Sequence, residues 1–185
     1  MGKQFYTAFS SPFNTFSIIW EKSVPHLQVK QIFLSDPDMS SELKALKAFP
    51  QISKGSSDYI ILLGKKIQRY FKGEVIEFEL DRLDFSCCSN TQKKVLFAEY
   101  EIPRGWVSTY KRIAIHVGIP RGARVVGNSL ARNPFPIVIP CHRAIKSNGE
   151  LGGYQGGISM KRTLLELEGL KITKRGKVLT NNIFY

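Results

Sequence analysis

Residues 133–143 of the 185-residue chain read NPFPIVIPCHR. This apolar run, ended by Pro140, predicts a buried extended segment that presents one side chain rigidly at a cleft. Cys141 with a histidine and an arginine beside it indicates a nucleophilic thiol, because such neighbours lower the thiol pKa from about 8.5. In a continuous strand Cys141 and His142 would point to opposite faces, so they cooperate only if the backbone turns or a water relays the proton. The alternative is that Cys141 is a small buried apolar residue.

Two short helices are predicted before this stretch. The first runs over residues 108–116, with Ser108 as its cap and Gly118 as its end, and the second begins at Pro120 and continues to about residue 132. Two helices around a Gly/Pro turn are typical of a helix-turn-helix, although any helical hairpin fits the same pattern. The second helix carries three arginines, which favours DNA as the partner: Arg121, Arg124 and Arg132.

The charge of the chain is concentrated in its second half. Residues 1–90 hold 11 Lys and Arg against 10 Asp and Glu, whereas residues 91–185 hold 16 against 5. Such an excess in one module is typical of a protein that binds phosphate backbones, because each neutralised phosphate releases counterions. A basic face that only aids solubility is the alternative, and an anionic membrane surface fits less well because no long basic amphipathic helix is predicted.

The first half predicts a small α+β domain. Runs of β-branched and aromatic residues predict strands over residues 16–20 and 28–34, and alternation predicts a third over 75–80. Helical spacing predicts two helices between them, one through Phe49 with Leu43 and Leu46 behind a Ser40-Ser41 cap, and one over 57–71. Strands and helices mixed in this way predict layers around one core.

Composition and length exclude several classes of protein. Hydrophobic residues make up 43% of the chain, and no apolar run approaches the roughly 20 residues of a membrane helix. The N-terminus lacks an apolar signal-peptide core, and three cysteines are too few for a disulfide framework. We expect a globular basic protein of the cytoplasm, or of the nucleus if the source is eukaryotic. We expect an N-terminal domain over residues 1–88, a C-terminal domain over 89–172 and a basic tail over 173–185.

Short motifs lie in order around the cysteine. They occupy residues 102–105, 107–110, 123–128, 133–134, 139–143, 149, 151–154, 156–157, 161–162 and 164–169. From residue 102 to residue 169 the chain closely resembles the O6-alkylguanine-DNA alkyltransferases, also called methylated-DNA–protein-cysteine methyltransferases. The Pro-Cys-His-Arg signature is highly specific to that family. The resemblance implies an N-terminal α/β domain of RNase H-like fold, followed by a mainly helical domain with a winged-helix-like helix-turn-helix and the active site.

The resemblance also implies the catalytic roles. Cys141 is the nucleophile and the permanent acceptor of the alkyl group from guanine O6, with O4-alkylthymine as a second substrate. His142, oriented by Glu168, takes the thiol proton through a water. Tyr110 donates a hydrogen bond to the base as negative charge builds on it. The reaction needs no cofactor, and we expect no metal, because Cys87 and Cys88 lack suitable partner ligands.

For the binding of DNA, the resemblance implies contact in the minor groove with the damaged nucleotide flipped out. Arg124 fills the gap in the duplex. The further DNA-binding candidates are Tyr110, Ala123, Arg121, Asn128 and Arg132. The candidates that shape the pocket are Asn133, which braces the site, Pro140, Arg143, Gly153, Tyr154, Gln155 and Gly156. Gln155 departs from the small residue common in the family, so it is expected to narrow the pocket or to supply another hydrogen bond.

Three other functions fit parts of the same pattern. A non-catalytic lesion binder is disfavoured because Cys141 is present, and a helix-turn-helix regulator because no metal-thiolate domain is added. A cysteine hydrolase using Cys141 and His142 is disfavoured by the basic charge. We expect one chain to act as a monomer on double-stranded DNA, and cooperative binding along DNA stays open.

Overall fold

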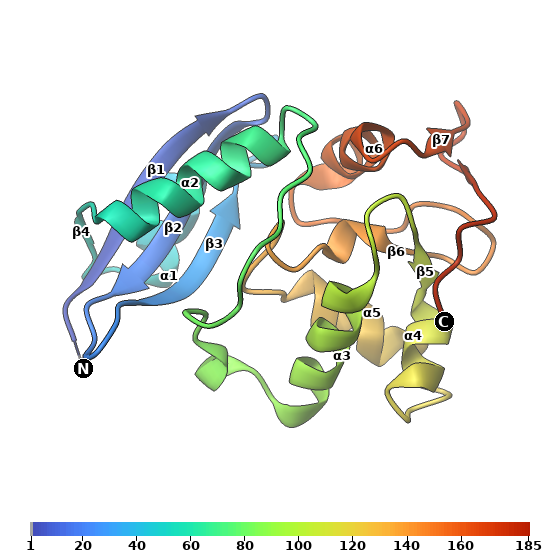
Figure 1. Ribbon diagram of the computed structural model, residues 1–185, viewed down its shortest axis with the longest axis horizontal. Coiled ribbons are helices and arrows are strands. Elements are labelled where there is room, and N and C mark those ends of the chain that lie inside the picture. The colour runs from blue at the N-terminus through green and yellow to red at the C-terminus, as the bar shows by residue number, and fades with distance from the viewer. Residues whose placement is uncertain (1) are drawn as a thin grey trace. The chain divides into compact units, whose positions relative to one another are not determined.

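The computed structural model describes residues 2–185, which form two compact units (Figure 1). One unit contains the chain up to Cys87 together with residues 134–138, and the other contains residues 88–133 and 139–185. The expected C-terminal domain included residues 134–138, but Ile32 N–H donates to Pro134 O at 2.7 Å, which attaches this short segment to the sheet of the first unit.

A four-stranded sheet forms the centre of the first unit, in the order β3-β2-β1-β4. Its strands are β1 (Gln4–Ser11), β2 (Asn14–Glu21), β3 (Gln28–Leu34) and β4 (Ser53–Lys54). The first three are antiparallel, with Ser11 opposite Asn14 at the hairpin turn, and β4 is parallel to β1. The strands predicted over 16–20 and 28–34 are therefore present, and β1 and β4 are additional strands that were not predicted from the sequence.

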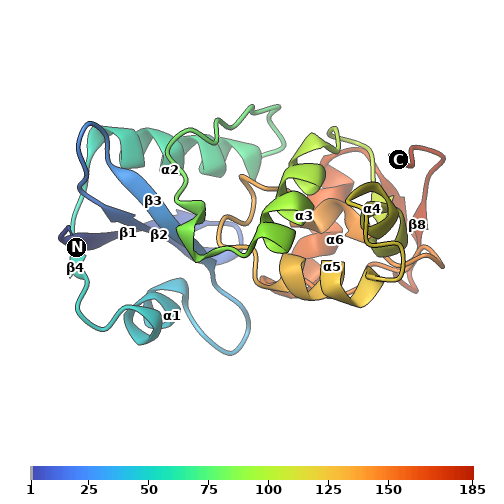
Figure 2. The same cartoon turned by 90° about the horizontal axis from the view of Figure 1, so that it is seen from below.

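Two helices cover the opposite faces of this sheet (Figure 2). Helix α1 (Ser41–Ala48) packs Ala45 against Ile19 of β2, whereas Phe71, which ends α2 (Asp58–Tyr70), contacts the ring of Phe16 edge-on. Phe16 and Ile19 lie on opposite faces of β2, so the centre of this strand is buried on both sides. That is why four of the five central residues of β2, Phe16, Ile18, Ile19 and Trp20, are apolar, with only the buried Ser17 among them.

One expectation for this unit is wrong, the strand over 75–80, whereas the helix capped by Ser40 is present. Residues 75–80 alternate between facing inward and outward, and Phe78 packs against Tyr70, but the segment pairs with no strand among residues 2–185. The alternation therefore reflects one anchored side chain in an extended connection. Helix α1 buries Ser41 and Ala45, while Leu43 and Leu46 are 54% and 40% exposed.

The second unit is mainly helical. It contains α3 (Asn90–Glu101), α4 (Tyr110–His116), α5 (Ala123–Ala131), a 3-10 turn η2 (Cys141–Arg143) and α6 (Gly157–Leu167). Two small pairs of strands complete it, β5 (Ser108–Thr109) parallel to β6 (Ala144–Ile145), and β7 (Lys171–Ile172) antiparallel to β8 (Val178–Leu179). Among residues 2–185 no helix is long and apolar enough to cross a membrane.

The predicted helix pair is present, with shifted starts. Thr109 caps α4, its side-chain oxygen accepting from Arg112 N–H at 3.2 Å, while the expected cap Ser108 belongs to β5. The second helix begins at Ala123, because Pro120 lies in the turn before it.

The segment expected to be a basic tail is folded into the second unit. After β8, Val107 N–H donates to Asn182 O at 3.0 Å, and Phe184 N–H donates back to Val107 O at 2.8 Å. Val178 is buried in the same apolar cluster as Val107 and Leu165. Residues 173–185 were expected to be a tail because they lie beyond the family resemblance, and the apolar residues after Lys177, with the backbone bonds to Val107, hold them in place.

Candidate active site

The backbone turns sharply at the cysteine, so the extended approach strand expected over residues 135–139 is absent. Ile137 has a φ of 76°, in the left-handed region that β-branched residues rarely adopt, and residues 141–143 form η2. Cys141 N–H donates to Ile139 O at 2.8 Å, and Arg143 N–H donates to Pro140 O at 2.8 Å. Because the backbone turns here, Cys141 and His142 do not lie on opposite faces of one strand.

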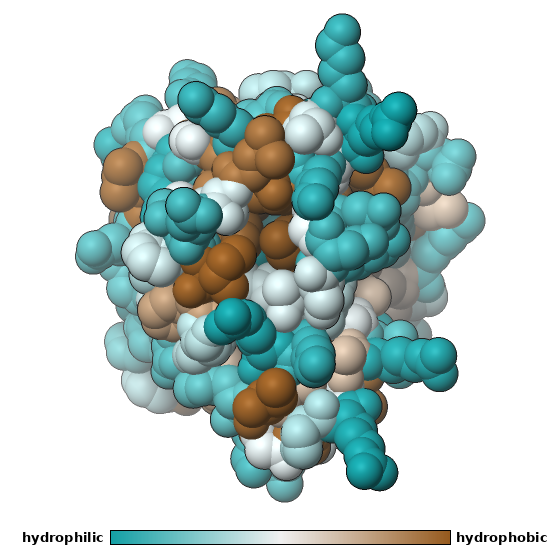
Figure 3. Space-filling view, turned by 90° about the vertical axis from the view of Figure 1, so that its right-hand side faces the viewer, coloured by the Kyte–Doolittle hydropathy of each residue, from teal (hydrophilic) through white to brown (hydrophobic). Residues whose placement is uncertain are grey.

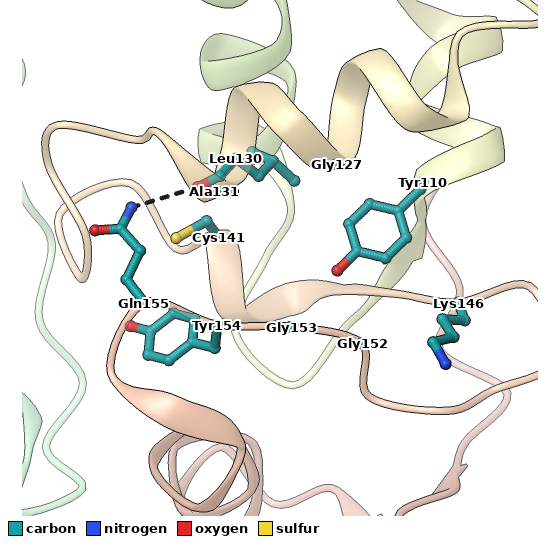
Figure 4. A pocket seen from close by; sticks show the side chains of 10 residues that line it. All are labelled: Tyr110, Gly127, Leu130, Ala131, Cys141, Lys146, Gly152, Gly153, Tyr154 and Gln155. Atoms are coloured by element: carbon teal, nitrogen blue, oxygen red, sulfur yellow. Dashed lines mark hydrogen bonds between the residues drawn. The ribbon is translucent and has the colours of Figure 1, made fainter. Parts of the chain in front are cut away.

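Cys141 lies in a pocket of about 360 Å³ formed entirely by the second unit. The pocket is lined by Tyr110, Gly127, Leu130, Ala131, Cys141, Lys146, Gly152, Gly153, Tyr154 and Gln155. Figure 4 shows the sulfur below the end of α5 and the Tyr110 hydroxyl directed inward from α4, with Tyr154 and the two glycines along the opposite wall. Only 5% of the cysteine is exposed, so a reaction partner must enter the pocket to reach it.

A buried carboxylate holds the two residues that follow the cysteine. Glu168 Oε1 lies 3.0 Å from His142 Nε2, and the Arg143 guanidinium donates to Glu168 from Nε at 3.0 and 3.1 Å and from Nη2 at 2.7 Å. Arg143 Nη1 also donates to Ile102 O at 2.6 Å, and Gly105 N–H donates to Glu168 Oε2 at 3.2 Å. The carboxylate thus fixes the orientation of the imidazole and anchors η2 to the end of α3.

Burial governs the electrostatics of this group. It raises the pKa of Cys141 to about 12, against the opposing effects of Asn133 and Lys161, so the thiol is protonated at neutral pH. It also lowers the pKa of His142, so that the imidazole is neutral. Burial alone would raise the pKa of Glu168, but His142 and Arg143 hold it well below its ordinary value. The site therefore contains an ionised carboxylate, a neutral imidazole and a neutral thiol.

Tyr110 is arranged as a hydrogen-bond donor. Burial raises its pKa to about 12, so the phenol keeps its proton. Its hydroxyl passes close to the backbone of Gly152, where a Cβ would lie only 2.6 Å from the oxygen. Gly152 also has a φ of 72°, so both its conformation and this close approach require glycine.

Amide side chains brace the entrance to the turn. Asn133 is 1% exposed, and its Nδ2 donates to Ile139 O at 3.0 Å. Gln155 Nε2 donates to Asn133 O at 2.8 Å and to Leu130 O at 3.4 Å. The amide of Gln155 is thus bound to the main chain at the end of α5, which matches the second of the two effects expected of it, an additional hydrogen bond.

The outer face of α5 is basic. Arg124 and Asn128 on the helix, Arg121 before it and Arg132 after it are all exposed, and Ala123 is half-buried at its start. None of these three guanidinium groups has a carboxylate within ion-pair distance in the described part of the chain. Figure 3 shows long hydrophilic side chains projecting around a hydrophobic band on the face at the right of Figure 1.

Two further charged residues lie under the pocket and were not assigned a role from the sequence. Glu99 of α3 and Lys161 of α6 are both completely buried. The signal was available for Glu99, since it follows Val95 by four residues and precedes Ile102 by three, which places it on the apolar face of its helix. Cys87 is exposed and Cys88 buried, and no group of three potential metal ligands occurs among residues 2–185.

Comparison with known proteins gives the family. The sequence profile described as 6-O-methylguanine DNA methyltransferase, DNA binding domain, matches residues 90–170. The crystal structure of the O6-methylguanine methyltransferase of Mycobacterium tuberculosis matches with a TM-score of 0.71 at 30% identity, covering 89% of this chain and 92% of that one. The chain belongs to the O6-methylguanine-DNA methyltransferase family.

Other members of this family are similar over different lengths. A methylated-DNA–protein-cysteine methyltransferase of Methanothermobacter thermautotrophicus is 46% identical over 107 residues, which are 57% of this chain. The aligned region spans 59% of that curated relative, and therefore less than two thirds of its length. The M. tuberculosis protein in complex with DNA matches with a TM-score of 0.67 at 29% identity, covering 88% of this chain and 91% of that one. The resemblance seen in the sequence is thus confirmed at the level of the family and of a mixed α/β fold.

Proposed function

We propose that this O6-methylguanine-DNA methyltransferase family member repairs DNA by moving an alkyl group from guanine O6 to Cys141, irreversibly and once per molecule. The observation that carries the proposal is a buried thiol at the end of a pocket, with a carboxylate-bound histidine next to it in the chain and a basic helix on the same unit. The names of the relatives supply the substrate class. O4-alkylthymine is a second substrate in this proposal.

The proposed reaction is an in-line displacement. A bond forms between Cys141 Sγ and the alkyl carbon as the bond between that carbon and O6 breaks, and guanine leaves with the electron pair. The thiol proton passes through a water to His142. Because Nε2 of that ring lies against the Glu168 carboxylate, it carries the hydrogen, and Nδ1 is the nitrogen that accepts the proton. The ionised carboxylate then stabilises the imidazolium.

Tyr110 completes the reaction by stabilising the leaving group. Its phenol is protonated and directed into the pocket, so it donates to the purine ring as negative charge develops there. The product is a thioether, which has no leaving group at neutral pH. Each molecule therefore acts once and needs no cofactor in this proposal.

For the partner we propose double-stranded DNA, bound by the α4–α5 pair as a helix-turn-helix of winged-helix type in the minor groove. Arg124 enters the duplex as the lesion is flipped, and Arg121, Asn128 and Arg132 contact the backbone. The chain acts as a monomer in the cytoplasm or nucleus, and the first unit is a variable domain of RNase H-like fold. A buried thiol reaches a base only after extrusion, which supports flipping.

Intact-mass spectrometry tests the transfer directly. After incubation with duplex DNA containing O6-methylguanine, the chain should gain one methylene unit, mapped to Cys141. Cys141→Ala should bind the same DNA with unchanged affinity and gain nothing, while Cys87→Ala, at an exposed cysteine, should react as the wild type does. If the wild-type mass stays unchanged while DNA is bound, the chain is a non-catalytic lesion binder.

A further inference from the structure

Two buried ionisable side chains outside the proposed mechanism lie on the helices that pack against the turn of Cys141. Glu99 comes from α3 and Lys161 from α6, and both residues are 0% exposed. Helices α3 and α6 both pack against η2, the turn that carries Cys141. Ionised side chains are rarely buried unless they are paired, so the presence of both at one place requires an explanation.

Lys161 ties together the two chain segments that frame the thiol. Its Nζ donates to Ala144 O at 2.6 Å, in the residue directly after η2, and to Gly153 O at 3.3 Å, in the wall of the pocket. The same ammonium lies 5.8 Å from the centre of the Tyr110 ring. One nitrogen thus links the nucleophile's turn and the opposite wall, close to the proposed donor.

Glu99 supplies the opposite charge from the other side. In the described chain neither of its carboxylate oxygens completes a hydrogen bond of normal geometry. The groups that act on its charge are Lys161, Arg143 and the Ala144 N–H, which favour the ionised form, and Glu168, which opposes it. Its own charge acts in turn on the Tyr110, Cys141 and Tyr185 side chains.

Each of the two side chains acts on the protonation of the other through its charge. Burial raises the pKa of Glu99 to about 8, against the effect of Lys161. Burial lowers the pKa of Lys161 to about 8, against the effects of Cys141 and Glu99. When one proton leaves the pair, the negative charge on Glu99 keeps the remaining proton on Lys161, and this extends the ammonium form to higher pH.

We propose that Glu99 is a positioning residue for alkyl transfer: it is the counter-charge that keeps the Lys161 ammonium bound to the Ala144 and Gly153 carbonyls on either side of Cys141. This inference rests on the proposed function. A carboxylate that only fills space in the core would not change the pH at which the site loses activity.

Glu99→Gln tests the inference, because glutamine keeps the shape and removes the charge. Removing a negative charge lowers the pKa of neighbouring groups, so the pKa of Lys161 should fall by at least about one unit. The rate of transfer from free O6-benzylguanine should fall at least about fivefold near pH 8, because a Lys161 pKa lowered by about one unit from about 8 leaves roughly a fifth of the ammonium form, and it should recover near pH 6. Glu101→Gln, on the same helix and with a side chain that is 59% exposed, should keep the wild-type profile.

The same substitution in a protein that lacks Lys161 shows whether the change in rate depends on that lysine. In Lys161→Met, adding Glu99→Gln should change the rate by less than about twofold, because no ammonium remains to be held. If Glu99→Gln unfolds the protein, Glu99→Leu gives the same test without a buried amide. Equal effects in both backgrounds, or a lower rate with an unshifted pH profile, would overturn the inference.

The failure of the proposed function would look different. If the wild-type chain takes no benzyl group, alkyl transfer itself is wrong. The pH dependence of Cys141 alkylation by iodoacetamide needs neither DNA nor guanine, and Glu99→Gln should move it to lower pH as well. An unchanged iodoacetamide profile in a folded variant would refute the role of Glu99 while leaving the proposed function intact.

Discussion

Removing the Glu168 carboxylate should destabilise the second unit more than any exposed carboxylate does. The Glu168 side chain is completely buried, and the Arg143 side chain that it binds is only 10% exposed. Glu168→Ala would leave a guanidinium buried without its counter-charge, together with a His142 Nε2 that has lost its acceptor. Breaking one partner of a buried pair costs about 3–5 kcal/mol, so the free energy of unfolding should fall by that amount.

Urea unfolding followed by circular dichroism measures the change. Glu166→Ala is the matched control, since its carboxylate is 45% exposed and bonds Arg162 one helical turn away; it should cost less than about 0.5 kcal/mol. A loss in Glu168→Ala no larger than that in Glu166→Ala would refute the role of the carboxylate as the anchor of η2.

The pH dependence of the free energy of unfolding tests the same role of Glu168, because the direction of the change is fixed by its pKa. The pKa of Glu168 in the folded chain lies below its ordinary value of 4.5, so its contribution is complete above that pH and is lost as the pH falls below it. The stability difference between wild type and Glu168→Ala should therefore shrink as the pH falls below about 4.5. A difference that grows in acid would contradict this reasoning.

Three further substitutions test the pocket and the basic helix. Gly152→Ala places a Cβ 2.6 Å from the Tyr110 hydroxyl, so transfer should slow at least about tenfold in single-turnover assays, while Ser147→Ala in an exposed loop should not change it. Gln155→Ala removes two bonds to backbone carbonyls and should lower the free energy of unfolding by about 1 kcal/mol in urea titrations. Arg124→Ala should slow repair of duplex DNA at least about tenfold and leave the reaction with free O6-benzylguanine within about twofold, because only the duplex requires extrusion; equal losses on both substrates would place the arginine elsewhere.

Much of the fold could be predicted where local signals agree with packing. The strand β2 was found because its buried centre, residues 16–20, is rich in aromatic and β-branched residues. Strand β1 was missed because Thr7 and Ala8 interrupt its aromatic residues and two serines end it. Residues 75–80 show what alternation of apolar and polar residues cannot predict. The alternation indicates which side chains face inward, but not whether a neighbouring strand is there to pair with. The start of α4 depends on one hydrogen bond, which the Thr109 side chain accepts from Arg112 N–H, and the sequence alone does not distinguish Thr109 from the neighbouring Ser108 as the cap.

The site divides in the same way. A short motif identified Cys141. The resemblance to a family then predicted catalytic roles for Glu168 and Tyr110, which lie far from Cys141 in the sequence. Glu99 could not be assigned a role by that route, because its meaning depends on Lys161, which lies on another helix. No sequence pattern relates two ionisable residues that come together only in the folded chain.

The burial of the sulfur has a consequence for the life of the protein in a cell. In the proposed function each molecule reacts only once, so a reaction of Cys141 with a peroxide or a small electrophile would consume the molecule before it repairs DNA. A protonated thiol with 5% exposure is a poor nucleophile toward such compounds. Under the proposed function, burial of the protonated thiol therefore protects Cys141 from side reactions until a damaged base enters the pocket.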